Sequence, residues 1–416
     1  MKIHILNIGD ELLIGQVVNT NASAMAEILG LNGYRVNRMI VTGDPVDEII
    51  RALEQSLCDA DVVLLSGGLG PTSDDRTREA LCRFFSCGMH TDESALANIR
   101  NIFERHAYKM SPANLKQAEV PDACKVIPNP LGTSPGMWFD VKGKVLCAVP
   151  GVPFEMERML REEIIPRLKE QFPSSHVLHR TVLTQGVGES FLAERIASWE
   201  EALPPFISLA YLPQPGMVRI RLTAEGNDFR LLNDETERQI GLLREIIPGY
   251  IFGFDQDTLE SVSGRLLQTM GKTLATAESC TGGYIAHLIT TVPGSSAYFK
   301  GGIVAYDNPV KSGVLKVSEE TLAVDGAVSR TVVCEMAESV RQLLKTDYSL
   351  AVSGIMGPEG GSPEKPVGTV WIAVSSPLKT EARLFRLGDE RMRNIRRTAL
   401  SALNMLRTIL MDEKGD

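Results

Sequence analysis

The stretch AESCTGGYIAHLITTVPGSSAYFKGGIVAYDNPVK, residues 277–311, decides how the rear half of this 416-residue chain is interpreted. Its flanking run 272–277 predicts a strand, 279–283 predicts a tight turn, and 284–291 has the apolar spacing of a helix. Ser279 therefore lies where a strand passes into a helix. The first turn of a helix carries unpaired N–H groups and a positive dipole end, which attract a phosphate, a carboxylate or a developing oxyanion.

Further along this stretch, a short apolar strand at 303–305 precedes Tyr306 and Lys311. A hydroxyl, a phenol and an amine can thus converge on one pocket. The residues alone leave a second interpretation open, because serines at such turns are most often helix caps and glycines there often serve only the turn. Cys280 is a rival nucleophile, since thiolates at helix N-termini are reactive.

Three motifs in this order, AESCTGG, VAYDNPVK and SGIMGPEGGSPEKPVGTVW, resemble the nicotinamide mononucleotide deamidase domain at the C-terminus of the CinA (competence/damage-inducible) family. The resemblance covers about residues 255–411 and implies that Ser279, Tyr306 and Lys311 are catalytic, without a metal. Two positions depart from the family pattern: Pro309 replaces a common glutamate, and Met356 replaces an alanine. Both change the shape of the pocket. We assign these residues to substrate binding: Cys280, Thr281, Gly282, Gly283, Gly357, Gly360, Gly361, Ser362 and Lys365.

The expected chemistry is attack on a carboxamide followed by protonation of the departing ammonia. Lys311, kept neutral by desolvation, takes the proton of Ser279, while Tyr306 shuttles a proton or donates a hydrogen bond. The N–H groups of the turn 280–283 form the oxyanion hole. An arginine-rich run at 391–397 is interpreted as a solvated helix face, and contact of one of its arginines with phosphate is the alternative.

Residues 1–170 alternate short apolar strands with helical patterns, which predicts a largely parallel sheet covered by helices on both faces. The third strand ends in SGGLGPTSDDRT, residues 66–77, and ligands of such sheets bind at the carboxyl ends of strands. This loop is typical of a phosphate cradle in front of a helix at 74–86. Glu11, Asp74 and Asp75 offer oxygen ligands for Mg²⁺ bridged to phosphate, although Asp74 can equally be a helix cap.

The motifs GDELLIGQVVNTN, GGLGPTSDDRT, NPLGTSPGMW and AVPGVPFEMERM resemble the N-terminal half of CinA proteins, which is similar in fold to molybdopterin-binding domains. In some members this half is a metal-dependent ADP-ribose pyrophosphatase, which yields AMP and ribose 5-phosphate. Asp74 and Asp75 are the metal candidates, and Glu155 is either a base or a helix-start residue. The predicted nucleotide site comprises Glu11, Asn19, Gly67, Gly68, Gly70, Thr72, Asp74, Asp75 and Thr133.

The segment QFPSS, residues 171–175, interrupts the pattern and predicts a boundary. The α+β pattern that follows resembles the KH-type domain of CinA proteins. Its nearest GxxG string, at 186–189, carries a carboxylate, which favours a spacer or dimer contact over RNA binding. We therefore predict an α/β protein: a molybdopterin-binding-like domain at 1–170 and an amidase domain at 254–416, joined by a KH-type α+β domain at 171–253.

Composition limits the partners of the chain. The 52 acidic residues outnumber the 43 basic ones, so a broadly basic surface for nucleic acid is not expected. Seven scattered cysteines predict reduced thiols. The start of the chain lacks the features of a signal peptide and no apolar run is long enough to span a bilayer, so we expect a cytoplasmic protein. The resemblance also implies a homodimer.

Two other functions stay open from the sequence. One is a molybdopterin-handling protein with a degenerate rear domain, which the intact Ser279, Tyr306 and Lys311 argue against. The other is a non-catalytic partner in DNA uptake, which the net charge of −9 disfavours.

Overall fold

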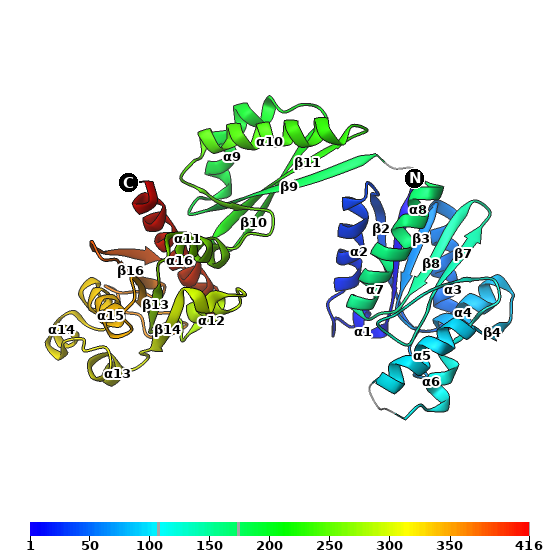
Figure 1. Cartoon of the computed structure of the whole chain (residues 1–416), viewed down its shortest axis with the longest axis horizontal. Helices are drawn as coiled ribbons and strands as arrows, with labels where there is room; N and C mark the ends of the chain where they lie inside the picture. The colour runs from blue at the N-terminus through cyan, green and yellow to red at the C-terminus, as the bar shows by residue number, and fades with distance from the viewer. Residues whose placement is uncertain (106–108, 173–174, 416) are drawn as a thin grey trace. The chain divides into compact units, whose positions relative to one another are not determined.

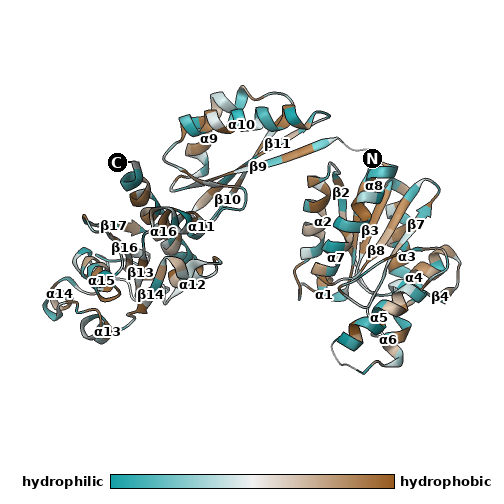
Figure 2. Cartoon of the chain, viewed as in Figure 1, coloured by the Kyte–Doolittle hydropathy of each residue, from teal (hydrophilic) through white to brown (hydrophobic). Residues whose placement is uncertain are grey.

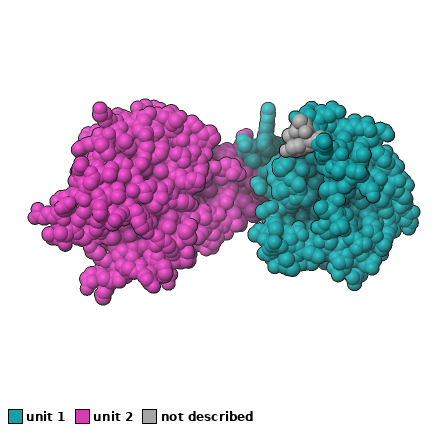
Figure 3. Space-filling view, turned by 90° about the horizontal axis from the view of Figure 1, so that it is seen from below, with its two compact units in different colours: residues 1–178, 224–233 teal, residues 179–223, 234–416 magenta. Residues whose placement is uncertain are grey.

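The computed structural model describes residues 1–105, 109–172 and 175–415. The chain divides into two compact units, one of residues 1–178 with 224–233 and the other of residues 179–223 with 234–416 (Figures 1 and 3). The predicted boundary at 171–175 includes residues 173 and 174, which lie outside the described residues. Each unit has its own sheets and its own core.

The front unit is built on a twisted sheet whose strands lie in the order β2 (Val36–Thr42), β1 (Ile3–Ile8), β3 (Val62–Ser66), β8 (Lys144–Val149), β7 (Gly136–Val141) and β6 (Lys125–Ile127). The pairs β1–β2, β1–β3 and β3–β8 are parallel. The pairs β7–β8 and β6–β7 are antiparallel, and a turn at Lys142-Gly143 joins β7 to β8.

Alternation along the strands buries both faces of this sheet, and hydrophobic residues run along β3 and β8 (Figure 2). Ile3 and Ile5 pack with α2 (Thr20–Leu31), α7 (Pro153–Met159) and α8 (Ile165–Gln171). Leu6 and Ile8 face the opposite side, against α3 (Val46–Asp59) and α4 (Thr77–Phe85). A π-helical turn links α7 and α8 at Leu160–Ile164.

Smaller elements complete the front unit. They are α1 (Asp10–Leu13), β4 (Met89–Thr91), α5 (Glu93–Arg105), α6 (Pro112–Lys116) and β5 (Glu119–Pro121). Strands β4 and β5 form an antiparallel pair of their own.

The KH-type region has a sheet in the order β10 (Ile207–Gln214), β11 (Met217–Gly226), β9 (His176–Gln185) and β12 (Ile251–Phe254), with helices α9 (Glu189–Glu201) and α10 (Phe229–Ile246). Along β11, residues 218, 220, 222 and 224 are buried and the intervening ones are more exposed. One face of this sheet is therefore covered and the other is open in part, as expected for an α+β fold.

The rear α/β fold has a sheet in the order β14 (Phe299–Val304), β13 (Leu274–Glu278), β15 (Tyr348–Gly354), β16 (Thr369–Ser375) and β17 (Thr380–Arg386). The pairs β13–β14 and β13–β15 are parallel, and the last two pairs are antiparallel. Its helices are α11 (Leu259–Met270), α12 (Tyr284–Thr290), α13 (Asn308–Gly313), α14 (Glu319–Asp325), α15 (Arg330–Leu343) and α16 (Arg391–Gly415), with a 3₁₀ turn at Ser295–Ala297.

Helices cover both faces of the rear sheet. Leu350 and Val352 pack with α11, α12 and α16, whereas Ala351 and Ala373 face α15. The fold therefore confirms the predicted class, with α/β folds at front and rear and a KH-type α+β fold between them. None of the helices among the described residues combines the length and apolar character that crossing a membrane requires.

Two local predictions are wrong. The helix after the glycine-rich loop begins at Thr77, not at residue 74, and the residue before it makes no side-chain cap. The reason is a turn closed by Asp75, whose carboxylate accepts hydrogen bonds from the Thr72 amide (2.9 Å) and hydroxyl (2.5 Å). Thr72, Ser73 and Asp74 therefore do not cap α4. Helices α13 and α14 were not predicted, because six or seven residues are too few for a periodic pattern.

Candidate functional site

The candidate site of the rear fold lies where the carboxyl ends of β13, β14 and β15 meet. Glu278, the last residue of β13, is in register with Val304 and Val352. The Ser279 amide donates to the Val352 carbonyl (3.1 Å), and the Ala305 amide donates to the Glu278 carbonyl (2.8 Å). These pairings place Ser279 beside the chain that leads into Tyr306 and Lys311, as the strand-end rule predicts.

Glu278 organises the turn that follows β13. Its side chain is 1% exposed, and its carboxylate accepts four hydrogen bonds, at 2.6 to 3.1 Å. The donors are the Thr281 hydroxyl and the amides of Gly283, Ile285 and Ala286. The buried charge thus satisfies the first turn of α12 and complements its dipole. The sequence analysis did not select Glu278, although a carboxylate at the end of an apolar strand has to find partners.

This arrangement determines which N–H groups are left for a ligand. The Gly282 amide donates to the Ser279 carbonyl, and the Gly283 amide donates to Glu278. The amides of Cys280 and Thr281 make no hydrogen bond within the part of the chain that the structure describes. Of the predicted oxyanion hole, these two N–H groups are therefore the ones available. Gly282 and Gly283 have φ of 63° and 99°, which favours glycine at both positions.

Lys311 is buried inside α13, with 2% of its surface exposed. Burial lowers the pKa of its ammonium group, and the nearby charge of Asp307 opposes this shift. Its Nζ donates to the backbone carbonyl of Tyr306 at 3.2 Å. Within the described residues no hydrogen bond joins this Nζ to the Ser279 hydroxyl, although catalytic hydrogen bonds often form only with substrate.

Pro309 has a structural role next to Lys311. Asp307 caps α13 through the Asn308 amide (2.8 Å), and Pro309 occupies the first turn, where its missing N–H is tolerated. The proline that departs from the family pattern is thus compatible with the helix that carries Lys311.

Tyr306 lies at the rim of the site, with 61% of its surface exposed. Arg391, the first residue of α16, donates to the Tyr306 hydroxyl (3.0 Å) and to the Gly357 carbonyl (3.0 Å). Its charge also acts on the Cys280 thiol. Arg391 therefore links Tyr306 to the Gly357 loop. Its side chain is exposed, as the interpretation of the run 391–397 as a solvated face predicts, but these two contacts distinguish it from the other arginines of the run.

The two candidate nucleophiles differ in their surroundings. Cys280 is fully buried, and burial raises the pKa of its thiol to about 12. A thiol with such a pKa is protonated at neutral pH and is a poor nucleophile. Ser279 is the neighbouring hydroxyl and needs only a base to become reactive.

The remaining substrate-binding candidates lie in the loop after β15. Met356 is buried, and its carbonyl accepts from Asn394 Nδ2 (3.0 Å) of α16. Lys365 Nζ donates to the Asp325 carbonyl at the end of α14 (2.8 Å). Gly360, Gly361 and Ser362 are exposed, and the contacts of the described residues do not bring them or Lys365 to Ser279. The structure therefore groups Gly357, but not the rest of this loop, with the catalytic candidates.

In the front unit a cavity of about 480 Å³ lies at the carboxyl ends of β1, β3 and β8. Thr72 does not line it, because this residue is bound to Asp75. Glu155 does line it, and burial raises the pKa of its carboxyl group, which also accepts from Asn129 Nδ2 (2.7 Å). The structure brings together these predicted residues: Glu11, Asn19, Gly67, Gly68, Gly70, Asp74, Asp75 and Thr133.

Neighbouring side chains fix the glycine-rich loop of this cavity by donating hydrogen bonds to its carbonyl groups. Arg78 Nη2 donates to the Leu69 carbonyl (2.8 Å), and the Thr77 hydroxyl donates to the Gly67 carbonyl (2.9 Å). In the described structure the amides of Gly68, Leu69 and Gly70 have no hydrogen-bond acceptor. A loop with satisfied carbonyls and unpaired amides is suited to an anion such as phosphate.

Asp44, which follows β2, is a cavity residue that the sequence analysis missed. Burial raises the pKa of its carboxyl group, and the charges of Asp10, Glu11 and Asp74 raise it further. Each of these three carboxylates is thus close enough to act on Asp44. The signal in the sequence was the position of Asp44 at the end of a strand that pairs with β1.

The carboxylates of this cavity meet only some of the requirements of a metal site. Among the residues that the structure describes, no group of three or more His, Cys, Asp or Glu has the arrangement of a metal site. Mg²⁺, however, usually keeps several waters and is bound by one or two carboxylates together with phosphate oxygens. Asp44 and Asp74 line the cavity and are candidates for this mode, although Asp44 also accepts from the Asp10 amide (3.1 Å) and Thr72 interacts with both Asp74 and Asp75.

Three family models match the chain. They are the "probable molybdopterin binding domain" over residues 4–170, the "damage-inducible protein CinA KH domain" over 179–253, and the "CinA C-terminal domain" over 256–410.

Relatives match over the whole length. A CinA-like protein of Cytophaga hutchinsonii is 44% identical over 410 residues, which cover 99% of this chain and 98% of that protein. A CinA-like protein of Flavobacterium psychrophilum is 42% identical and covers 98% of each chain. Among solved structures, the competence/damage-inducible protein CihA of Agrobacterium tumefaciens is 39% identical, covers 36% of this chain and 94% of that chain, and has a TM-score of 0.35.

The role of Glu278 leads to a stability prediction. Replacing Glu278 with Gln puts an NH₂ group against amide and hydroxyl donors, so the rear fold is expected to lose about 2–4 kcal/mol. Thr281→Ser keeps its hydroxyl and is expected to lose less than about 1 kcal/mol. Urea unfolding followed by the fluorescence of Trp371, in a chain with Trp138 and Trp199 replaced by Phe, measures both. Equal stability of Glu278→Gln and Thr281→Ser would contradict the role of the carboxylate.

Proposed function

This chain belongs to the CinA family, and from that premise we propose that its rear fold hydrolyses the carboxamide of nicotinamide mononucleotide to the carboxylate and ammonia. The observation that carries the proposal is Lys311, a buried lysine with a lowered pKa next to the turn that holds Ser279 and Cys280. A neutral amine beside a serine hydroxyl is a known way to activate the hydroxyl as a nucleophile.

In the first step Lys311 Nζ accepts the Ser279 proton while Oγ attacks the carboxamide carbon. The amides of Cys280 and Thr281 receive the oxyanion, because they are the unpaired N–H groups of the turn. Lys311 then protonates the nitrogen, the C–N bond breaks and ammonia leaves. Water, deprotonated by the same lysine, hydrolyses the Ser279 ester and releases the pyridine carboxylate.

Arg391 suits the phosphate of this substrate. Its guanidinium lies at the rim, bound to the Tyr306 hydroxyl and the Gly357 carbonyl, and Tyr306 is exposed beside it. Arginine binds phosphate through paired N–H groups. We therefore assign Arg391 to substrate orientation, with Tyr306 positioned by it.

For the front fold we propose metal-dependent hydrolysis of ADP-ribose to AMP and ribose 5-phosphate. The observation that favours it is the cavity of about 480 Å³ with a phosphate-type loop on one side and the carboxylates of Asp44 and Asp74 on the other. A bound Mg²⁺ supplies charge neutralisation at the diphosphate. The loop amides bind phosphate oxygens, and Glu155, with its raised pKa, orients and deprotonates water. Both proposed substrates are fragments of NAD.

The nucleophile is tested by two neighbouring substitutions. Ser279→Ala is expected to lower kcat/KM for ammonia release from nicotinamide mononucleotide at least about 10³-fold, because the attacking oxygen is removed. Cys280→Ala is expected to keep most of the activity, because Cys280 acts through its backbone amide. An active Ser279→Ala protein, or an inactive but folded Cys280→Ala protein, would remove the serine from the mechanism.

The base is tested by pH. Only neutral Lys311 accepts a proton, so kcat/KM is expected to rise with pH and then to reach a plateau. The midpoint of this rise is expected to lie below the ordinary lysine pKa of 10.5. Lys311→Arg is expected to be inactive throughout, because a guanidinium stays protonated. Lys300→Arg, at an exposed position of β14, is the control and should keep the profile. A wild-type profile without this rise would exclude Lys311 as the base.

The front site is tested separately. Asp44→Asn is expected to lower Mg²⁺-dependent AMP release from ADP-ribose at least about tenfold, and ammonia release from nicotinamide mononucleotide should not change. Asp47→Asn is the matched control, since its side chain is 85% exposed at the start of α3. If Asp44→Asn and Asp47→Asn behave alike, Asp44 has no part in the reaction.

A further inference from the structure

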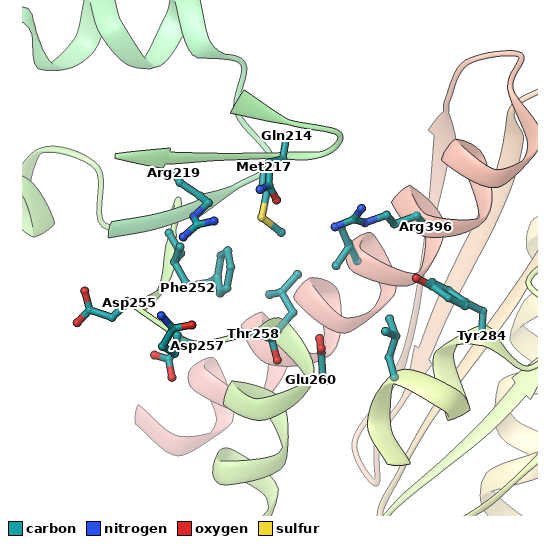
Figure 4. Close-up of a pocket in the computed structure, with 15 residues that line it drawn as sticks. Gln214, Met217, Arg219, Phe252, Asp255, Asp257, Thr258, Glu260, Tyr284 and Arg396 are labelled. Atoms are coloured by element: carbon teal, nitrogen blue, oxygen red, sulfur yellow. The ribbon is translucent and has the colours of Figure 1, made fainter. Parts of the chain in front are cut away.

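A separate cavity of about 270 Å³ lies inside the rear unit, between the KH-type sheet and the rear α/β fold (Figure 4). Its walls come from the KH-type strands β9, β10 and β11, from residues between Phe252 and Glu260, and from helices α12 and α16. The lining residues used below include Met217 and Arg219 of β11, Tyr284 and Leu288 of α12, and Arg396 and Leu400 of α16. Ser279, Tyr306 and Lys311 do not line it. It is therefore distinct from the candidate catalytic site, and the proposal below does not depend on the activity assigned to that site.

The floor of this cavity is apolar. Leu183, Phe252, Leu259 and Leu400 are each buried, and they belong to one hydrophobic cluster that joins the KH-type sheet to α11 and α16. Met217 packs against the same cluster. A gap at the edge of such a cluster offers an apolar molecule a place to bury its surface.

Two arginines approach the cavity from opposite walls (Figure 4). Arg219 Nε is buried and has no hydrogen-bond partner among the described residues. Arg396 is exposed, and no carboxylate of the described chain forms an ion pair with it. Neither guanidinium is neutralised by an ion pair within the described residues, so the charge of both is available to an anion in the cavity.

The acidic side chains around the cavity do not neutralise these arginines. Asp255 is bound to Arg180 Nε (2.9 Å) and the Thr181 amide (2.8 Å). Asp257 is bound to Arg265 Nη2 (2.7 Å) and the Phe254 amide (3.0 Å). Glu260, in the first turn of α11, is the third carboxylate at the cavity. Among the described residues, the unpaired guanidinium groups of Arg219 and Arg396 therefore share the cavity with one unpaired carboxylate.

We propose that this cavity binds a small anion with an aromatic or other apolar body. The body rests on Phe252, Leu259 and Leu400, and the anionic group lies between Arg219 and Arg396. A carboxylate and a phosphate monoester share this chemistry. Solvation alone explains an exposed arginine such as Arg396, but it does not explain why Arg219, which is partly buried, lines an apolar hollow without an ion pair among the described residues.

The test is a titration of the full chain, labelled with ¹³C at the methionine methyl groups. Phenyl phosphate and benzoate are the two anionic probes, and benzyl alcohol is the uncharged one. The Met217 resonance, assigned through Met217→Leu, is expected to shift saturably with at least one anion and far less with benzyl alcohol. The tighter of the two anions identifies the preferred head group. Met356, beside the catalytic candidates, reports any binding there instead.

Matched arginine variants complete the experiment. Arg219→Gln and Arg396→Gln are each expected to weaken binding about tenfold, as the loss of one charge-assisted hydrogen bond predicts. Arg221→Gln on the same strand and Arg393→Gln on the same helix are exposed, do not line the cavity and should keep the wild-type Kd. Unchanged methyl spectra outside the cavity show that each variant is folded.

Three results would overturn the proposal. They are the absence of a saturable Met217 shift with both anions, equal binding of benzyl alcohol, and wild-type affinity in both Arg219→Gln and Arg396→Gln. A shift at Met356 without a shift at Met217 would also overturn it, because the anion would then occupy the other site.

Discussion

The rear half of the molecule depends on one buried carboxylate. Glu278 ends an apolar strand and finds its partners in the next eight residues, at the Thr281 hydroxyl and at the amides that begin α12. Because those amides are occupied, α12 does not offer its N-terminus to a ligand as helices of this kind often do. The carboxylate instead fixes the turn, so that the free amides are those of Cys280 and Thr281.

The front unit reaches a similar arrangement with the opposite charge. There the buried guanidinium of Arg78 and the Thr77 hydroxyl bind the carbonyl groups of the glycine-rich loop. The carbonyl groups of this loop thus have hydrogen-bond donors within the protein, and among the described residues the amides of Gly68, Leu69 and Gly70 stay unpaired. Gly67 and Gly68 make this possible, since a side chain at either position would meet the Ile8 carbonyl or Thr77. In each unit a charged side chain, Glu278 at the rear and Arg78 at the front, binds backbone groups near the strand ends. The backbone N–H groups that stay unpaired are then the ones available to a ligand.

Sequence periodicity predicted most strands and long helices, because the central strands of the front and rear sheets are buried on both faces and apolar along their length. It also placed Ser279 correctly at a strand end. Glu278 was missed although its partners are local, because the pattern of an apolar strand followed by a helix does not show that the carboxylate turns back to the amides of α12. Asp44 and Arg391 were not singled out because their neighbours come from the tertiary fold. Asp44 meets Asp10 and Glu11 because β2 pairs with β1, and Arg391 meets Tyr306 across a separation of 85 residues. Nothing in the local pattern around either residue distinguishes it from a solvated charge.

In the rear unit, the cavity of about 270 Å³ and the catalytic candidates share two helices, α12 and α16. Helix α12 begins at Tyr284, which lines the cavity of about 270 Å³, directly after the Gly283 amide that Glu278 binds. Helix α16 carries Arg391 at the catalytic candidates and Arg396 at the same cavity. The first turns of α12 and α16 therefore each contribute residues to both places. A displacement of α12 by a molecule in the cavity would act on the hydrogen bonds of Glu278, and through them on the turn whose free amides define the proposed oxyanion hole.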